Sequence, residues 1–417
     1  MTHASFPQDI DVDRAYELLR QVVIRTPLQF HKRLSEKFGA EIWIKREDLQ
    51  VVRSYKLRGA YNLMHGLTAE ERSRGIVAAS AGNHAQGVAW SCQALGIDGV
   101  IYMPAITPRQ KINQVRMFGG ERIRIVLVGD TFDACQQEAQ SYCREHRMTF
   151  IPPFDHPRIV EGQGTVGREI LEELPDVDLI FVPIGGGGLS AGIGRFIGSR
   201  SAGVSLVGAE PLGAPSMKEA IKAGEPVTLE SIERFVDGAA VKRVGDVTFP
   251  LCREALSDVV LVPEGKVCST ILRLYNEDAI VAEPAGVLSI AALDFYPGAL
   301  AGKRIVCVLS GGNNDIDRMQ EIKERSLLYE GLKHYFIVRF AQRPGALREF
   351  VNDILGPTDD IVRFEFIQKH NKENGPALIG IEVKNREDCQ TLMDRMQSHD
   401  LNFTLVNQDE NLFEYLV

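Results

Sequence analysis

From residue 75 to residue 309, short apolar segments alternate with segments of helical periodicity, and no other feature limits the fold as much. The apolar segments have the length and composition of strands that are buried on both faces. Strands that alternate with helices predict an α/β protein whose parallel sheets are covered by helices on both faces. The expected strands are 42–44, 75–79, 100–103, 123–128, 149–151, 179–182, 205–208 and 305–309.

The expected helices place the candidate loops between them. A first helix should be capped by Asp11 or Asp13, with apolar residues at helical spacing up to Val23. In a parallel sheet, ligands bind at the loops beyond the carboxyl ends of the strands, so function is expected after residues 79, 183 and 309. The later helices are expected at 107–118, in a segment through residue 139, and at 166–173.

A change of pattern near residue 330 predicts a smaller C-terminal domain. Its elements follow the order strand, helix, strand, strand, helix, strand, which is the ferredoxin-like arrangement. A polar turn at 369–375 should join the two middle strands. The expected strands are 334–340, 361–367, 377–383 and 401–406, and the expected helices are one that ends near residue 355 and one at 386–396.

Composition and charge exclude several classes of protein. The net charge of -9 and the pI near 5.6 argue against nucleic acid as the main partner. The seven cysteines are odd in number and form no CxxC pair, which suggests reduced thiols. No apolar run has transmembrane length, and the N-terminus lacks a signal-peptide pattern. A cytoplasmic protein without a membrane partner is therefore expected.

The stretch SYKLRGA, residues 54–60, places Lys56 at the expected start of a helix. Ser54 is the expected N-cap, so Lys56 would lie in the first turn. The positive end of the helix and burial both disfavour the ammonium form and lower the pKa of the lysine. Such an amine can form a Schiff base. An ordinary surface lysine is the alternative, and the other loops must decide between the two.

The first candidate loop, SAGNHAQG at 80–87, follows a strand and opens a helix. Its small residues expose backbone N–H groups, which can bind an anion such as the carboxylate of an amino acid. Asn83 adds a neutral donor at the same place, whereas we interpret the His84 side chain as structural rather than as a base. The alternative is an ordinary turn with capping polar residues.

The second candidate loop follows the strand 179–182 and contains Gly185, Gly186, Gly187 and Gly188. Successive glycines let the backbone wrap around a phosphate, with a helix dipole behind it. A P-loop is excluded because no Gly-Lys follows. The dinucleotide spacing GxGxxG fails at Ser190. Glu210 nevertheless lies where a ribose-binding acid would be, so a nicotinamide enzyme stays as a minority alternative.

The third candidate loop, LSGGNN at 309–314, offers the hydroxyl of Ser310 to a ring nitrogen of a bound cofactor, with an N-cap as the alternative. No cluster of His or Cys has metal-ligand spacing. Three isolated acids precede Gly or Pro, and we interpret them as solvated or capping residues: Glu210, Asp237 and Glu283.

Four motifs in order, SYKLRGA, SAGNHAQG, GGGGL and LSGGN, make the chain resemble the fold-type-II pyridoxal-phosphate enzymes, most closely the biosynthetic threonine dehydratases with a single regulatory domain. The resemblance implies a catalytic domain at 1–330 with two three-layer subdomains built on parallel sheets. The smaller subdomain would span about 54–155. Residues 331–417 would form an α+β, ferredoxin-like regulatory domain similar to ACT domains.

The resemblance also implies a role for each motif. Lys56 would bind pyridoxal 5'-phosphate covalently, Asn83 would hydrogen-bond the ring hydroxyl and Ser310 would meet the pyridine nitrogen. The phosphate would be held by the backbone of the glycines and Leu189, and Tyr55 would lie near the ring. The substrate carboxylate would be held by Ser80, Ala81, Gly82, Asn83 and His84.

A hydroxyl at the ring nitrogen leaves the pyridine less charged than a carboxylate would, which favours β-elimination over transamination. The implied reaction converts L-threonine to 2-oxobutanoate and ammonia, with Lys56 as the base that removes the α-proton. The alternatives are a serine dehydratase and a serine racemase, in which Ser80 could act on the opposite face. A non-catalytic amino-acid sensor is disfavoured by the intact lysine. Some relatives bind a cation beside Glu210, but here the second acid is replaced by Ser216, so no metal site is expected.

The C-terminal module implies regulation by the product of the pathway. In the family it resembles, that means feedback inhibition by isoleucine opposed by valine, in an oligomer of two or four chains. The alternative is a structural or dimerising appendage that binds no ligand.

Overall fold

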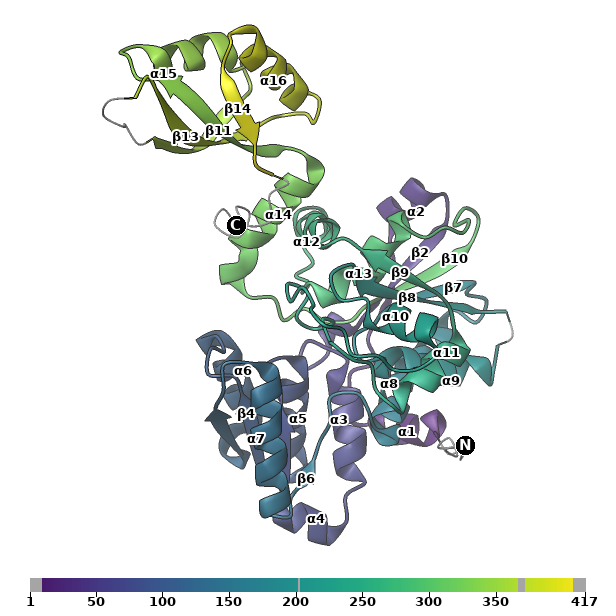
Figure 1. Cartoon of the computed structure of the whole chain (residues 1–417). Helices are drawn as coiled ribbons and strands as arrows, with labels where there is room; N and C mark the ends of the chain where they lie inside the picture. Colours follow the sequence, from purple (N-terminus) through teal and green to yellow (C-terminus); the bar gives the residue numbers. More distant parts are fainter. Residues whose placement is uncertain (1–9, 202, 367–371, 408–417) are drawn as a thin grey trace. The chain divides into compact units, whose positions relative to one another are not determined.

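The computed structural model describes residues 10–201, 203–366 and 372–407 (Figure 1). The chain divides into two compact units, and each is considered by itself. Unit one comprises Met1–Glu264 and Leu274–Asp315. Unit two comprises Gly265–Arg273 and Ile316–Val417.

Unit one is built on two sheets, and the larger one has the strand order β1-β2-β10-β7-β8-β9. Strand β1 is antiparallel to β2, and the other pairs are parallel. The central strands β7 and β10 are buried almost throughout, which explains their continuous apolar sequences. The bounds are β1 Leu28–Phe30, β2 Glu41–Arg46, β7 Leu179–Pro183, β8 Ser205–Pro211, β9 Leu256–Val262 and β10 Arg304–Leu309.

Helices α8 (Pro157–Glu173) and α9 (Gly188–Gly198) pack on this sheet through one apolar cluster. The two helices approach each other at backbone distance, because a Cβ atom on Gly192 would lie 2.4 Å from the carbonyl oxygen of Val160. Helix α8 begins nine residues before the expected start at 166. Its glycines lower helix propensity, but the close packing that they permit holds the segment helical.

The smaller sheet of unit one is wholly parallel, in the order β5-β4-β3-β6. One face packs on helices α3, α5 and α6, and the other packs on α7. The two sheets with helices on both faces confirm the predicted α/β class. The bounds are β3 Ile76–Ala79, β4 Gly99–Met103, β5 Ile123–Leu127, β6 Thr149–Phe150, α3 Lys56–His65, α5 Asn83–Leu95, α6 Arg109–Gly119 and α7 Phe132–Glu145.

The other helices of unit one are shorter or peripheral. Asp11 caps α1, as expected, since its side chain accepts a hydrogen bond from the N–H of Arg14, but the helix ends at Leu19, before Val23. Strands β1 and β9 and several helices were not expected from the sequence. The remaining helices that start in unit one are α1 Val12–Leu19, α2 Lys32–Phe38, α4 Ala69–Arg74, α10 Ser216–Ala223, α11 Thr248–Ala255, α12 Glu264–Asp278 and α13 Leu288–Ala291.

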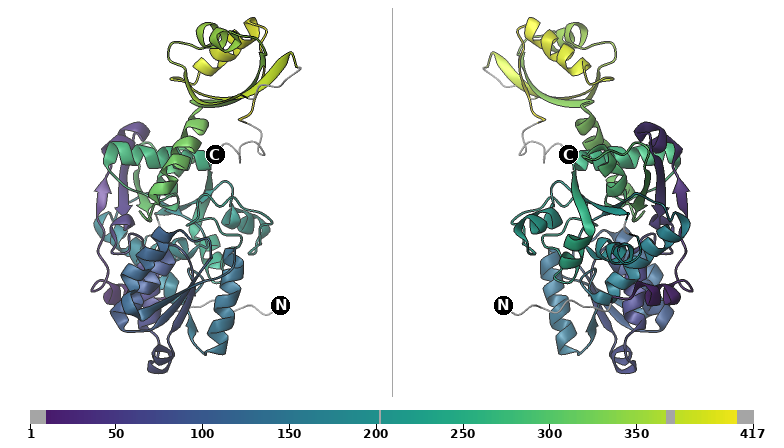
Figure 2. Two further views of the ribbon diagram at one scale, coloured as in Figure 1. Left: turned by 90° about the vertical axis from the view of Figure 1, so that its left-hand side faces the viewer. Right: turned by 90° about the vertical axis from the view of Figure 1, so that its right-hand side faces the viewer.

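Unit two carries an antiparallel sheet in the order β12-β13-β11-β14, with helices α15 and α16 on one face (Figure 2). The predicted ferredoxin-like order of elements is confirmed. The first helix ends after one turn and continues as a π-helical turn at Phe350–Ile354. Part of the predicted polar turn, at 369–371, lies outside the described residues. The bounds are α14 Met319–Glu330, β11 Lys333–Ala341, α15 Ala346–Glu349, β12 Asp360–Phe366, β13 Asn374–Glu382, α16 Asp388–Ser398 and β14 Asn402–Leu405.

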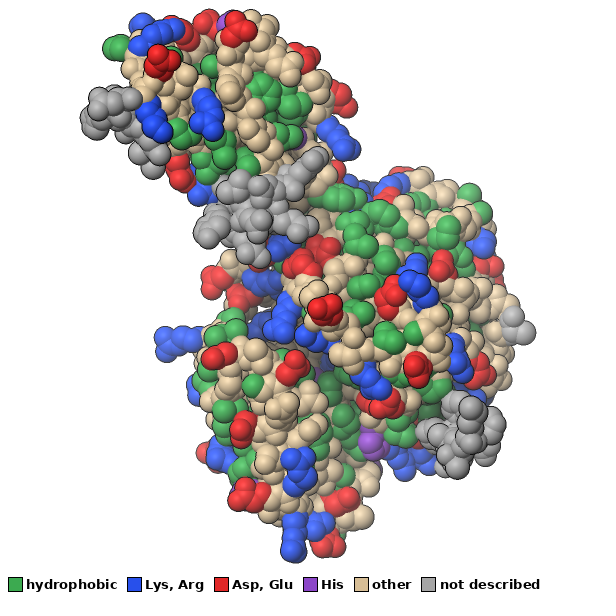
Figure 3. Space-filling view, viewed as in Figure 1, with side chains coloured by type: hydrophobic (Ala, Val, Ile, Leu, Met, Phe, Trp, Pro, Cys, Tyr) green, Lys and Arg blue, Asp and Glu red, His purple; other side chains and the backbone are tan. Residues whose placement is uncertain are grey.

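The surface carries charges of both signs. On the face shown in Figure 3, Lys and Arg side chains alternate with Asp and Glu side chains over both units. Within the described ranges, no helix is both long and apolar enough to span a membrane.

Candidate active site

Lys56 is the first residue of α3, after the loop that follows β2. Its side-chain nitrogen Nζ donates a hydrogen bond to the carbonyl oxygen of Pro153 at 3.1 Å. Burial lowers the pKa of Lys56 to about 8, although the nearby carboxylate of Glu283 opposes this shift. The residue as a whole is nevertheless partly exposed. A lysine with a lowered pKa at a partly exposed position is suited to form a Schiff base.

The prediction that Ser54 caps α3 is wrong. Tyr55 occupies the N-cap position, and no side chain caps the helix. Ser54 instead pairs through its backbone with Gly311, and its buried hydroxyl has no hydrogen-bond partner among the described residues. The Tyr55 N–H donates to the carbonyl of Ser310 at 3.3 Å. These contacts fasten the loop that leads into α3 to the loop after β10.

Tyr55 and Ser310 both belong to this junction. Lys56 Nζ lies 5.3 Å from the centroid of the Tyr55 ring. Burial, reinforced by the charge of Glu283, raises the pKa of Tyr55, so the phenol keeps its proton. Ser310 follows the last residue of β10 and is only 2% exposed. Its hydroxyl is thus available inside the protein rather than at the surface.

Asn83 opens helix α5 and is held by two other side chains. Its Nδ2 donates to Oε1 of Glu283 at 2.5 Å, and its Oδ1 accepts from Nδ2 of Asn313 at 2.7 Å. Asn313 also donates to the carbonyl of Val52 at 2.8 Å. The orientation of the Asn83 amide is therefore fixed, with its NH₂ group on the side of Glu283.

Glu283 is a functional candidate that the sequence analysis misjudged. The interpretation as a solvated or capping acid is wrong, because the residue is buried and binds the side chain of Asn83. Burial, together with the charge of Asp237, raises the pKa of Glu283 to about 7. Asp237 itself is half exposed and pairs with Lys111 of α6 at 2.7 Å. Both charges of the ion pair are close enough to Glu283 to shift its pKa, Asp237 upward and Lys111 downward.

The other residues of the first loop flank Asn83. Ser80 Oγ accepts a hydrogen bond from the N–H of Gly82, and Gly82 is the N-cap of α5. The buried ring of His84 is bonded through Nε2 to the carbonyl of Ile151 at 2.8 Å. Burial lowers the pKa of His84 to about 3, so it stays neutral. His84 can therefore serve a carboxylate only through its backbone, while the small Ala81 leaves the loop open.

In the glycine loop, two carbonyl groups accept hydrogen bonds from other residues, whereas the backbone N–H groups stay free within the part of the chain that the structure describes. Thr248 Oγ1 donates to the carbonyl of Gly186 at 2.5 Å, and Cys252 Sγ donates to that of Gly187 at 3.3 Å. In the described ranges, nothing accepts a hydrogen bond from the backbone N–H groups of Gly185, Gly186 or Gly187. Gly187 has φ +92°, and α9 starts at Gly188. The loop therefore fits a phosphate, which binds free N–H groups at a helix N-terminus.

A segment that the sequence analysis missed, Pro153–Phe154, connects Lys56 to this loop. A Cβ atom on Gly186 would lie 2.3 Å from the ring of Phe154. On the opposite side, a Cβ atom on Gly238 would lie 3.9 Å from Oε1 of Glu283, and one on Gly185 would lie 3.4 Å from the Gly238 carbonyl. The contacts thus close around Lys56. We call these residues the site ring: Lys56, Phe154, Gly185, Gly186, Gly238, Glu283, Asn83, Asn313 and Ser310.

The site ring fits pyridoxal phosphate. It combines an amine with a lowered pKa, a cradle of free N–H groups and a fixed amide, and these suit the aldehyde, the phosphate and the hydroxyl of that cofactor. It contains no feature that requires a nicotinamide. Glu210, the proposed ribose ligand, instead accepts hydrogen bonds from the N–H groups of Met217 and Lys218 at 2.7 and 2.9 Å and so caps α10.

A buried ionic network holds α3 in place. Arg58 is fully buried and forms two hydrogen bonds each with the carboxylates of Glu47 and Glu169, at 2.7 to 2.9 Å. Lys45 completes the network, with Nζ 2.7 Å from Glu169. Burial by itself would lower the pKa of Arg58, but the two carboxylates outweigh burial and raise the pKa overall. Because Arg58 lies two residues after Lys56, the network fixes where the lysine emerges.

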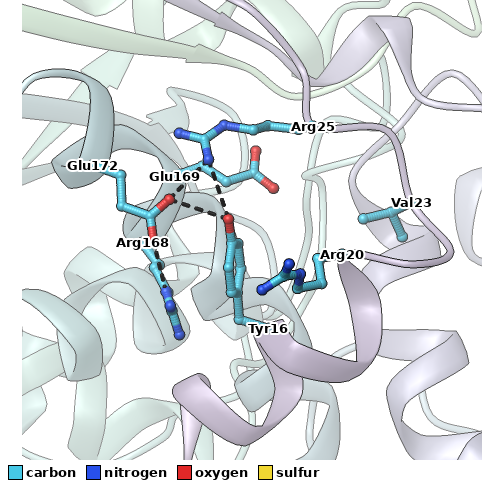
Figure 4. Close-up of a pocket in the computed structure, with 7 residues that line it drawn as sticks. All are labelled: Tyr16, Arg20, Val23, Arg25, Arg168, Glu169 and Glu172. Carbon is cyan, nitrogen blue, oxygen red and sulfur yellow. Dashed lines mark hydrogen bonds and ion pairs between the residues drawn. The ribbon is translucent and has the colours of Figure 1, made fainter.

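The surface of unit one also contains a pocket of 420 Å³ that includes no predicted site residue (Figure 4). Its charges are already paired. Arg25 and Arg168 each lie 2.9 Å from Glu172, and the Tyr16 hydroxyl donates to the same carboxylate at 3.1 Å. The pocket therefore offers a ligand no unpaired cation from these two arginines. Its lining is Tyr16, Arg20, Val23, Arg25, Arg168, Glu169 and Glu172.

No three His, Cys, Asp or Glu side chains within the described ranges are grouped to hold a metal ion. Burial raises the pKa of Glu210 to about 7, and its oxygens face backbone N–H groups of α10. Ser216 Oγ lies 3.4 Å from Glu210. The acid thus has a capping role in this structure, which is one of the two roles expected for it.

Two family models match the chain. Residues 19–311 match the pyridoxal-phosphate-dependent enzyme family. Residues 324–416 match the C-terminal regulatory domain of threonine dehydratase. The biosynthetic L-threonine dehydratase IlvA of Halalkalibacterium halodurans is 55% identical over 408 residues, which cover 98% of each chain.

Solved structures give the same result for the larger part of the chain. Threonine deaminase isoform 2 from Solanum lycopersicum is 39% identical, with a TM-score of 0.71 over 76% of this chain and 90% of that one. Maize serine racemase is 28% identical, with a TM-score of 0.70 over 76% of this chain and 97% of that one. The fold is thus shared by enzymes that act differently on hydroxy amino acids.

Proposed function

Since this chain belongs to the threonine dehydratases within the pyridoxal-phosphate-dependent enzymes, we propose that it converts L-threonine to 2-oxobutanoate and ammonia at the site ring. The observation that carries the proposal is the amine of Lys56. Its pKa is lowered to about 8, it opens a helix, and it lies between a phosphate cradle and a fixed amide. The nicotinamide alternative is discarded, because the family uses pyridoxal phosphate.

The residues of the site ring would hold the cofactor as follows. Lys56 binds it covalently, the N–H groups from Gly185 to Leu189 hold its phosphate, and the NH₂ group of Asn83 meets its ring hydroxyl. Ser310 meets the pyridine nitrogen, and Tyr55 lies beside the ring. When bound, pyridoxal phosphate supplies the electron sink that makes the α-proton of the substrate acidic.

The protein then has to bind the amino acid and move one proton. The N-terminus of α5, with Ser80 and the backbone N–H groups of 81–84, carries the positive dipole end that suits the substrate carboxylate. Lys56 Nζ, whose lowered pKa of about 8 leaves a substantial neutral fraction near pH 8, accepts the α-proton. The hydroxyl group of threonine leaves from Cβ and takes up a proton to form water. The remaining enamine, 2-aminobut-2-enoate, hydrolyses to 2-oxobutanoate and ammonia.

The proposal is tested with the purified full-length protein and added pyridoxal phosphate. Incubation with L-threonine should release 2-oxobutanoate and ammonia in equal amounts. Replacement of Asn83 by Ala should lower this rate by about tenfold or more, because a hydrogen bond to the cofactor is lost. If L-serine is instead converted to D-serine and neither amino acid yields a keto acid, the racemase alternative is correct and the proposal fails.

We further propose that residues 331–417 are the regulatory domain, that residues 1–330 with a subdomain at about 54–155 are catalytic, and that isoleucine inhibits through the C-terminal domain while valine opposes it. The match of 324–416 to the regulatory domain of threonine dehydratase supports this. In the full-length enzyme, isoleucine should lower activity and valine should restore it. A chain truncated after residue 330 that retains threonine turnover should no longer respond. Equal inhibition of both chains would contradict the assignment.

We infer a dimer or tetramer, which sedimentation analysis of the purified protein can test, and a cytoplasmic location. Six cysteines support the location, because they are buried free thiols, as in proteins from a reducing compartment: Cys92, Cys135, Cys143, Cys252, Cys307 and Cys389. A fluorescent fusion that accumulates outside the cytoplasm would contradict it.

A further inference from the structure

Phe154 lies between Lys56 and the glycine loop of the site ring. The carbonyl of its neighbour Pro153 accepts the hydrogen bond from Lys56 Nζ at 3.1 Å. Its own ring lies directly on the glycine loop, since a Cβ atom on Gly186 would be 2.3 Å from the ring atoms. One on Gly188 would be 3.1 Å from Phe154 Cβ. A ligand bound between Lys56 and the glycine loop would therefore contact Phe154.

The segment that carries this ring is held rigidly. The carboxylate of Asp155 accepts hydrogen bonds from three consecutive backbone N–H groups, those of Asp246, Val247 and Thr248, at 3.0, 2.8 and 3.2 Å. Phe154 is partly exposed, as are its neighbours Pro153 and Asp155. A fixed aromatic side chain that is not fully buried can contact a ligand as well as pack against the loop.

The covalent structure of the cofactor indicates which part of the substrate lies there. The carbon that receives the amino acid is flanked by the ring hydroxyl on one side and by the phosphate-bearing arm on the other. In the proposed function, Asn83 marks the hydroxyl side and the glycines mark the phosphate side. In that arrangement, the substrate Cα would direct its carboxylate to the N-terminus of α5 and its proton to Lys56. Its side chain would then face the phosphate side, where Phe154 lies against the glycine loop.

We propose that the phenyl ring of Phe154 is the apolar wall that receives the methyl group of threonine and so favours threonine over serine. This inference rests on the proposed function, because it takes the places of carboxylate and phosphate from there. Threonine and serine differ by that one methyl group. One methyl or methylene group in an apolar pocket changes kcat/KM by about 10-fold to 200-fold.

The test compares Phe154→Leu with Phe154→Asn in the full-length holoenzyme. The two replacements have nearly equal size, so only the polarity of the wall differs. The ratio of kcat/KM for L-threonine to that for L-serine should stay within about threefold of the wild-type ratio in the Leu variant and fall by about tenfold in the Asn variant. Phe132→Ala, on α7 outside the site ring, serves as the control for an unrelated phenylalanine.

A binding measurement separates specificity from turnover. L-Alanine and L-2-aminobutanoate have no leaving group and differ by the same methyl group, so both can be titrated by the change in cofactor absorbance. Their affinity ratio should follow the kinetic ratio. Equal ratios in the Leu and Asn variants would overturn the inference, as would a lowered cofactor affinity with unchanged ratios. If the wild type deaminates neither threonine nor serine, the proposed function itself has failed.

Discussion

Asn83 Nδ2 lies 2.5 Å from Oε1 of Glu283, a residue 200 positions further along the chain. The contact joins the first strand-end loop to the segment before η3 (Ala285–Val287). It gives the proposed cofactor-binding amide a buried, titratable partner. Substitutions of Glu283 and of the charged residues beside it can therefore test the proposed role of Asn83.

The first prediction concerns Glu283→Gln. The carboxylate form is the better acceptor for the Asn83 amide, and loss of a charged hydrogen bond lowers kcat/KM by about tenfold to a hundredfold. Because the pKa of Glu283 is raised to about 7, the wild-type kcat/KM should increase with pH through about 7. The variant should lack this acid limb. Glu70→Gln, an exposed acid, should leave the pH profile unchanged.

The second prediction uses the ion pair of Lys111 and Asp237. Asp237 raises the pKa of Glu283 and Lys111 lowers it. Lys111→Met should therefore shift the acid limb of kcat/KM to higher pH, whereas Asp237→Asn should shift it to lower pH. The double variant should lie between the two. Shifts in the same direction in both single variants would refute the electrostatic explanation, and Lys222→Met, an exposed lysine, is the control.

The third prediction concerns Gly186→Ala. The added methyl group would lie 2.3 Å from the Phe154 ring, so either the ring or the loop has to move. Overpacking of this kind costs about 1–3 kcal/mol, and the dissociation constant of pyridoxal phosphate should increase by about tenfold or more. Gly198→Ala is the matched control, because a Cβ atom there meets nothing within 4 Å at the other end of α9. Equilibrium dialysis of both variants measures the difference, and equal affinities would exclude this role of the loop.

The fourth prediction concerns Arg58→Met. The substitution leaves Glu47 and Glu169 buried with only Lys45 to balance them, which destabilises a protein by about 3–5 kcal/mol. Urea unfolding followed by fluorescence should show this loss together with weaker cofactor binding. Arg74→Met removes a partly exposed ion pair and should change stability by at most about 1 kcal/mol. Similar unfolding midpoints for the two variants would argue against the network as the anchor of α3.

The sequence was sufficient for features that depend on local pattern. Alternating apolar segments identified the parallel strands, and the glycines and small residues at strand ends identified the three loops that the structure brings around Lys56. The fold class and the order of elements in the C-terminal module were likewise predicted. These features are encoded within a few neighbouring residues, so no tertiary information was needed to recognise them.

Features that depend on distant contacts could not be predicted. Ser54 has the composition of an N-cap, but its backbone pairs with Gly311, so it does not cap the helix. In the sequence, Glu283 cannot be told from a solvated acid, because its burial and its hydrogen bond with Asn83 both depend on distant residues. Phe154 carries no local signal, since an aromatic residue in a proline-containing loop is common; its position beside both a reactive lysine and a glycine loop is visible only in three dimensions.

The most direct test of the central claim is the visible absorption spectrum of the purified full-length protein after dialysis against pyridoxal phosphate and then against buffer. If Lys56 binds the cofactor covalently, the wild type should retain a visible absorption band that borohydride abolishes. Lys56→Ala should lack this band and should not form 2-oxobutanoate from L-threonine. A colourless wild type, or a Lys56→Ala variant with the same band and undiminished turnover, would contradict the account.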